Sequence, residues 1–229
     1  MAAYDYAIVG AGISGLVAAS VLGKKGRKAL VLERNDCIGG CLRTEEITAP
    51  GFVHDVMATM LVLFLTSPAY GALAKELQAR GFSVAHSDLP TGVLRPDGSH
   101  VLFSRDRARN MATFEACAKG DGEAFAREMA QMGADAPFLF ALLGGQLWSR
   151  QTAILIAREA WRRGPRALAA WFGEALRPSR HYLESTYASE ALHALWAPWG
   201  LLCGLNPESA YSAQMVKVIA FFLLANALR

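Results

Sequence analysis

Three glycines near the start of the chain have the spacing that a phosphate-binding turn requires. Gly10, Gly12 and Gly15 follow the apolar run Tyr6–Val9, and residues 16–22 then have the length and composition of a helix. The first glycine permits a tight turn, the second leaves space for a pyrophosphate, and the third lets the helix pack close to a strand. Free N–H groups at the helix start would bind the anion. The binding residues predicted from this turn are Gly10, Gly12, Ile13, Ser14 and Gly15.

An acidic residue ends the next apolar run. Lys28–Leu32 is predicted to form a second strand, and Glu33 follows it, 18 residues after Gly15. Both apolar runs have the composition of strands that are buried on both faces. A carboxylate at this place accepts the hydroxyl hydrogens of an adenosine ribose and repels a 2′-phosphate, which disfavours NADP. The order strand, glycine turn, helix, strand and acid therefore predicts a dinucleotide site.

A pair of adjacent glycines further along the chain bears on the choice between FAD and NAD. Five residues separate Glu33 from Gly39 and Gly40, which are followed at 41–44 by Cys-Leu-Arg-Thr. This segment resembles the flavoprotein group of amine oxidases and phytoene desaturases, in which an acid, five residues, Gly-Gly-Arg, two residues and Ser or Thr follow one another. Residues 15–19 and 44–46 are most similar to the branch of phytoene desaturases, carotenoid isomerases and pyridine nucleotide-disulfide oxidoreductase domain proteins.

The resemblance implies FAD as the cofactor. It places the backbone of the glycine pair along the ribityl chain and diphosphate of FAD, and Thr44 at the hydroxyl position of the motif. Cys41 stands where the group has arginine, and Arg43 lies two residues later, where we expect a further contact. Together with Glu33, the FAD contacts expected in this part of the chain are Arg34, Gly39, Gly40, Cys41, Arg43 and Thr44.

His54 and Asp55 are the candidate catalytic residues. They lie in the segment 50–58, which resembles the stretch that enters the flavin site in this group. A flavin takes hydride without a protein base, so a hydrogen-bonded structural role is the alternative for both residues. The other four histidines are isolated along the chain, and we expect structural or surface roles for them.

The four cysteines show no paired framework. Cys37 and Cys41 flank the glycine pair, whereas disulfide reductases place both cysteines after it. No other Cys or His pair has the spacing of zinc ligands, so we expect neither a redox disulfide nor a metal. These cysteines, together with a first strand that no secretory leader precedes, favour a cytoplasmic location.

The composition excludes two classes of partner or location. The chain has 229 residues, of which 53% are hydrophobic, and a net charge of +3. This charge is too small to indicate nucleic-acid binding. No run of about 18 apolar residues occurs, so we expect no membrane span, while attachment to a membrane surface stays open.

The middle of the chain is predicted to form an inserted substrate and cap region, residues 81–205. It lies between an FAD-binding portion, residues 1–80, and a helix at 206–229 that leads back towards that portion. Gly92–Arg95 and His100–Phe103 are predicted to pair across an Asp-Gly turn. An antiparallel hairpin cannot extend a parallel sheet without a crossover, so it belongs to a second sheet.

Residues 106–190 have apolar side chains at spacings of three and four, which predicts a run of helices. We expect breaks at four places where glycine or proline interrupts this pattern. These places are Gly120, Gly144-Gly145, Gly164-Pro165 and Pro178.

Seven arginines and only two acids lie between Arg150 and Arg180, interleaved with Trp161, Trp171 and Phe172. One hypothesis is a patch that binds a membrane surface, because basic and aromatic residues suit that interface. The other is an ordinary helical surface, with solvated arginines and tryptophans in the core.

The expected fold class is α/β: a Rossmann-type FAD-binding βαβ unit with an inserted antiparallel hairpin and a helical cap, the C-terminal part of the fold being missing. The resemblance implies an FAD-dependent oxidoreductase that dehydrogenates, desaturates or isomerises a small apolar, polyene-like substrate by hydride transfer. An amine oxidase-like flavoenzyme, a non-catalytic fragment and one subunit of a split flavoenzyme are the alternatives. A first sheet without neighbours exposes an apolar edge, so we expect a partner subunit or a homodimer to complete the fold.

Overall fold

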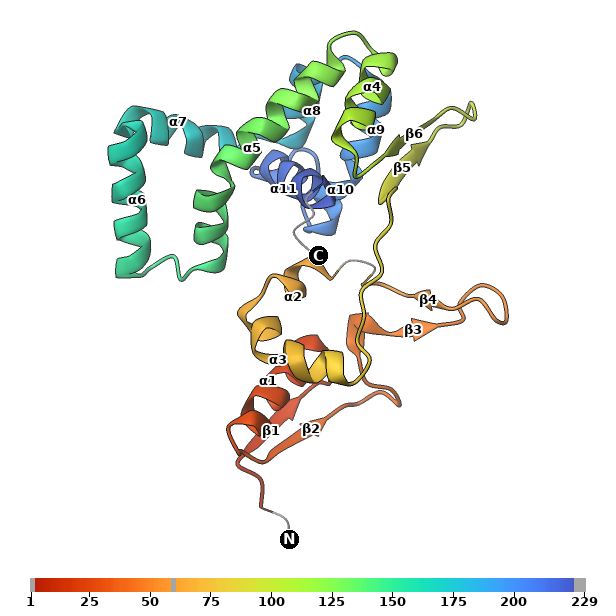
Figure 1. Cartoon of the computed structure of the whole chain (residues 1–229), viewed down its shortest axis with the longest axis vertical. Coiled ribbons are helices and arrows are strands. Elements are labelled where there is room, and N and C mark those ends of the chain that lie inside the picture. The colour runs from red at the N-terminus through yellow and green to blue at the C-terminus, as the bar shows by residue number, and fades with distance from the viewer. Residues whose placement is uncertain (1–2, 59–60, 225–229) are drawn as a thin grey trace. The chain divides into compact units, whose positions relative to one another are not determined.

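The chain forms two compact units, each of which is described by itself. The computed structural model describes residues 3–58 and 61–224. The first unit ends at Ala85 and the second begins at His86, five residues after the predicted boundary at residue 80 (Figure 1).

A strand, a helix and a strand open the first unit in the predicted order. β1 (Tyr6–Val9) and β2 (Ala29–Leu32) pair in parallel, with Tyr6 opposite Ala29, and α1 (Ile13–Lys24) connects them. β3 and β4 then form a short antiparallel pair. The later elements of this unit are η1 (Gly40–Leu42), β3 (Thr44–Glu45), β4 (His54–Asp55), α2 (Val62–Leu65) and α3 (Pro68–Ala79).

The helix α3 packs against α1 and was not predicted from the sequence. Ser67 caps it, because the Ser67 hydroxyl accepts a hydrogen bond from the N–H of Tyr70 at 3.2 Å, and Pro68 occupies the first turn. The ammonium of Lys24, at the end of α1, lies 2.6 Å from a carboxylate oxygen of Glu76 in α3. The two helices therefore support one side of the first strand pair.

The prediction that both strands are buried is wrong. Val9 is 86% exposed and Tyr6 is 48% exposed, and Leu32 on the second strand is also exposed. Within the described residues, β1 and β2 form a sheet of two strands only. A parallel strand becomes buried on both faces when helices pack on both sides of its sheet. Here α1, which connects the two strands, packs against them.

The second unit begins with the predicted antiparallel hairpin. β5 (Thr91–Leu94) pairs with β6 (His100–Phe103), and the N–H of Arg95 donates to the carbonyl of Ser99 at 2.8 Å to close the turn. As predicted, this hairpin is a sheet separate from that of β1 and β2.

Helices make up the rest of the second unit, and all four predicted breaks are confirmed. The break at Gly144-Gly145 is the end of α5, a helix that continues through Pro137 without a break. Gly120 precedes α5, Gly164 separates α6 from α7, and Pro178 precedes α8. The helices are α4 (Arg107–Cys117), α5 (Asp121–Gly144), α6 (Arg150–Arg163), α7 (Pro165–Ala175), α8 (Ser179–Thr186), α9 (Glu190–Trp196), α10 (Pro198–Leu202) and α11 (Ser212–Leu224).

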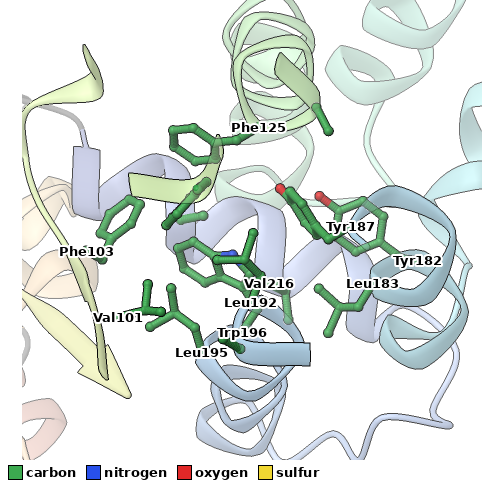
Figure 2. Packing of buried hydrophobic residues seen from close by; sticks show 14 of the residues in the cluster. Val101, Phe103, Phe125, Tyr182, Leu183, Tyr187, Leu192, Leu195, Trp196 and Val216 are labelled. Carbon is green, nitrogen blue, oxygen red and sulfur yellow. The ribbon is translucent and has the colours of Figure 1, made fainter. Parts of the chain in front are cut away.

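An aromatic cluster forms the core of the second unit (Figure 2). The ring centroids of Phe103 and Trp196 are 4.9 Å apart, and those of Phe114 and Phe125 are 5.0 Å apart, both with edge-to-face geometry. Val216 from α11 is buried in the same cluster. The structure thus places α11 in the second unit, and residues 225–229 of the helix predicted at 206–229 lie outside the described residues.

A buried carboxylate fixes the rotation of α6. Glu159 is buried and accepts hydrogen bonds from the guanidinium groups of Arg162 and Arg163. Arg163 also lies 2.7 Å from a carboxylate oxygen of Asp135 in α5. The hydrogen bonds from Arg162, the largest cause, and from Arg163 lower the pKa of Glu159 to about 2. The inner face of α6 is therefore bound to α5 through charged groups.

Glu159→Gln is expected to lower the stability of the second unit in a pH-dependent way. The folded-state pKa of Glu159 lies below its ordinary value of 4.5, so its stabilisation is fully present above that value and is lost as pH falls towards about 2. The difference in melting temperature between wild type and variant, measured by circular dichroism, should therefore shrink between pH 5 and pH 2.5.

Glu123→Gln is the matched control, because Glu123 forms an exposed ion pair with Arg127 at 4.0 Å. Such a pair contributes about 0–1 kcal/mol. A difference between wild type and Glu159→Gln that stays constant with pH would contradict the role given to this carboxylate.

Candidate dinucleotide-binding site

The glycine turn leads directly from β1 into the start of α1. Gly10 has a φ of +95°, a conformation that favours glycine, and its N–H donates to the carbonyl of Leu32 at 2.7 Å. Gly12 precedes the helix, and no side chain caps it. The N–H groups of Ile13 and Ser14 have no carbonyl partner within α1, because they lie in its first turn. This helix start can therefore donate hydrogen bonds to an anion.

The three glycines of the turn meet different surroundings. A Cβ atom on Gly15 would lie 2.1 Å from the carbonyl oxygen of Gly10, which confirms the close contact between helix and strand. A Cβ atom on Gly12 would meet nothing within 4 Å. Protein packing therefore does not require glycine at position 12, and the open space there fits the predicted pyrophosphate.

The second glycine pair lies against the first turn. The N–H of Gly39 donates to the carbonyl of Ala11 at 2.8 Å, and Gly12 and Gly39 form a parallel bridge. A Cβ atom on Gly40 would lie 3.1 Å from the Cα atom of Gly12. Gly39 and Gly40 also have φ values of +114° and +57°. Two motifs 24 residues or more apart in sequence thus form one glycine-lined surface.

Glu33 lies at the end of β2, beside this surface. Its Oε2 accepts a hydrogen bond from the N–H of Ala11 at 2.7 Å, and its Oε1 accepts from the backbone of Arg34 and from Asn35. The bond from Ala11, the largest cause, lowers the pKa of Glu33 below its ordinary value. The carboxylate is therefore ionised at neutral pH, and Oε2 retains a lone pair for a hydroxyl group.

The contacts of Ala11 and Asn35 were missed by the sequence reasoning. Ala11 is buried and uses its N–H for Glu33 and its carbonyl for Gly39. Its side chain carries no chemical signal, since only its backbone acts. The side-chain amide of Asn35 donates to Glu33 at 2.8 Å, and its place two residues after the acid is the signal that could have been used.

Other residues predicted to contact FAD have protein partners. The hydroxyl of Thr44 donates to a carboxylate oxygen of Asp55 at 2.8 Å. The guanidinium of Arg43 lies 2.5 Å from Glu45 and 3.8 Å from the sulfur of Cys37. The side chains of Arg34 and Cys41 are exposed. Their contacts with a cofactor stay predictions.

His54 and Asp55 do not act as one pair in this structure. His54 is hydrogen-bonded through Nε2 to the hydroxyl of Thr48 at 2.7 Å, whereas Asp55 accepts from Thr44. They are neighbours in β4, and successive side chains of a strand point to opposite faces. The structure thus supports separate hydrogen-bonded roles and gives no acid–base dyad.

One cavity lies in the second unit. Its volume is about 590 Å³. Charged groups line much of it, including Glu128, Asp135, Arg163 and Lys217. Within the described residues, no cluster of His, Cys, Asp and Glu could hold a metal, and no helix is long and apolar enough to cross a bilayer.

Known proteins give the same assignment for the first unit. Residues 8–77 match the NAD(P)-binding Rossmann-like domain. The chain is 31% identical over 121 residues to a limonene dehydrogenase subunit of Castellaniella defragrans, an alignment covering 53% of this chain and 21% of that protein. It is 30% identical over 122 residues to 4,4′-diapophytoene desaturase of Staphylococcus haemolyticus, covering 52% and 23%.

The chain thus spans about a fifth of the length of the curated relatives it matches. A solved structure, the CLA-producing fatty acid isomerase from P. acnes, superposes with a TM-score of 0.51 at 19% identity, over 96% of this chain and 44% of that one. This likeness shows the fold. Residues 8–77 thus carry a Rossmann-like dinucleotide-binding domain, as predicted, and two of the relatives are named as a dehydrogenase subunit and a desaturase.

Gly15→Ala is expected to destabilise the first unit, because the new methyl group would lie 2.1 Å from the backbone of Gly10. Moving that backbone should cost about 1–3 kcal/mol. Hydrogen exchange of the amides in β1 and β2 would measure the loss for this unit alone.

Gly23→Ala is the matched control in the same helix, since a Cβ atom there meets nothing within 4 Å. Alanine inside a helix should raise stability by roughly 0.5–1 kcal/mol. Equal protection of β1 and β2 in Gly15→Ala and wild type would show that the close contact is not needed.

Proposed function

We propose that this chain forms the adenosine-diphosphate part of the FAD site in an oxidoreductase that acts on an apolar, polyene-like substrate. The observation that carries the proposal is the meeting of two glycine motifs beside one ionised acid. Gly12 leaves open space beside the turn, and Gly40 lies close to the backbone of Gly12. Ala11 connects Glu33 to the second glycine motif, because its N–H donates to Glu33 and its carbonyl accepts from Gly39.

Each part of this arrangement matches one part of the cofactor. The helix start at Ile13 offers N–H groups to the diphosphate. Glu33 accepts the hydroxyl hydrogens of the ribose, and its negative charge disfavours a 2′-phosphate. The glycine pair lets the chain run close to the ligand. The first unit therefore holds and orients the cofactor from its adenosine side.

Bound FAD supplies the acceptor for a hydride from a C–H bond. The residues of this chain contribute binding and orientation. The two candidate catalytic residues of the first unit, His54 and Asp55, are hydrogen-bonded to Thr48 and Thr44. The proposed chemistry is hydride transfer to the flavin with loss of a proton from the neighbouring carbon, the proton passing to water or to a group outside the first unit, or double-bond isomerisation.

The substrate class is inferred from the relatives. One is named a limonene dehydrogenase subunit and another a diapophytoene desaturase. These names support a small apolar substrate for the complete enzyme. Because the chain covers about a fifth of these relatives, the activity of the chain alone is part of the proposal.

A second candidate is that the chain is one part of a flavoenzyme that further polypeptide completes. The exposed apolar side chains of Tyr6 and Val9 on a two-stranded sheet favour this candidate. One relative is itself named as a subunit. Additional strands, from a partner subunit or a second copy, would cover these side chains.

Gly12→Val and Glu33→Ala are expected to weaken FAD binding. The valine side chain would occupy the open space at the turn, and removal of the carboxylate would leave the ribose hydroxyls without an acceptor. Each change should raise the dissociation constant roughly tenfold to a hundredfold. Titration of the chain with FAD, followed by calorimetry, measures this effect.

Gly23→Ala should bind FAD as wild type does, and ADP should compete with FAD for the wild-type chain. Far-ultraviolet circular dichroism checks that the variants are folded. Equal FAD affinity in wild type and both variants would overturn the assignment of the glycine turn and Glu33.

A further inference from the structure

The helix α6 has two faces of opposite character. Thr152, Glu159 and Arg163 lie on one face. The hydroxyl of Thr152 donates to the carbonyl of Gln146, and Arg163 bonds both to Glu159 and to Asp135 in α5. Ile154 and Trp161 follow one another by seven residues on the opposite face. In an α-helix this spacing puts both side chains on one stripe.

The outer face of α6 carries large apolar side chains that are exposed to solvent. Trp161 is 93% exposed and Ile154 is 65% exposed. Trp148, in the turn before α6, is 97% exposed, and its neighbour Leu147 is exposed as well. Tryptophan is rarely left so open on a soluble surface, and a contiguous apolar patch marks an interaction site. We call these four residues the α6 apolar patch.

Positive charge surrounds the α6 apolar patch. Arg150 and Arg158 on α6 are exposed, as is Arg166 at the start of α7. The only acid in α6 is Glu159, which is buried and bonded to two arginines. The exposed surface of this helix therefore carries cations without exposed carboxylates, which favours an anionic partner.

The structure changes which aromatic residues belong to this surface. Trp171 packs against Phe138, with centroids 5.1 Å apart, and the guanidinium of Arg163 lies over its ring. Phe172 contacts the same two rings. Trp171 is therefore partly buried against α5, while Trp161 and the unpredicted Trp148 are on the surface.

We propose that the outer face of α6, with Trp148 before it, binds the surface of a bilayer that contains anionic lipid. Tryptophan is favoured at the level of lipid headgroups, and arginines beside it bind their phosphates. The backbone of a helix is already hydrogen-bonded, so an apolar helix face can enter the interface without exposing unpaired N–H groups. This inference does not depend on the cofactor proposal.

The test is co-sedimentation of the full chain with phosphatidylcholine vesicles, with and without phosphatidylglycerol, at low salt. We expect binding to the vesicles with phosphatidylglycerol, together with a blue shift of tryptophan emission. Trp148→Ser combined with Trp161→Ser should weaken this binding roughly tenfold or more. Leu201→Ser combined with Leu202→Ser is the matched control, since both leucines are exposed elsewhere in the second unit and should not matter.

Arg150→Gln combined with Arg158→Gln should reduce binding to the anionic vesicles, and added salt should have the same effect. Two results would overturn the proposal: no binding of the wild-type chain at low salt, or equal binding by the double tryptophan variant. Loss of self-association in that variant, without vesicle binding by wild type, would instead assign the α6 apolar patch to a second copy.

Discussion

The close approach of backbone to backbone around Gly12 is the constraint on which the first unit depends. A side chain on Gly15 would lie 2.1 Å from Gly10, and one on Gly40 would lie 3.1 Å from Gly12. The absence of these side chains lets the start of α1, the end of β1 and the segment after β2 meet. Ala11 then joins all three through its N–H and its carbonyl. The acid and the helix start are thereby both held at this turn.

Features that depend on neighbouring residues could be predicted from the sequence. The strand–helix–strand order, the hairpin turn and the helix breaks follow from glycine, proline and apolar runs that act locally. Burial could not be predicted, because it depends on which other elements pack against a strand or helix. Val9, for example, was predicted to lie in a buried strand and is exposed. The partners of Thr44 and His54 could not be predicted either, since they arise from the pairing of β3 with β4.

The second unit combines an aromatic core with paired charges at the helix contacts. Lys217 lies 3.0 Å from Glu128 and 4.3 Å from the ring centre of Tyr182. Removing such charges from water costs free energy, so they persist where each has a partner. The pairing of Arg163 with both Glu159 and Asp135 has a further consequence, because it sets the rotation of α6. With Glu159 turned inward, Trp161 must face outward. The exposure of this tryptophan thus follows from the buried charges and not from a lack of core.

Two exposed apolar surfaces, β1 with β2 and the α6 apolar patch, differ in a way that indicates different partners. An edge of a strand offers N–H and C=O groups in a row, so it suits another strand and is poorly suited to lipid, where unpaired groups are costly. Tyr6 and Val9 lie on such a strand. The helix α6 has its backbone groups paired internally and carries arginines beside its tryptophans. Polypeptide is therefore the expected cover for the strands, and a charged lipid surface the expected cover for the helix.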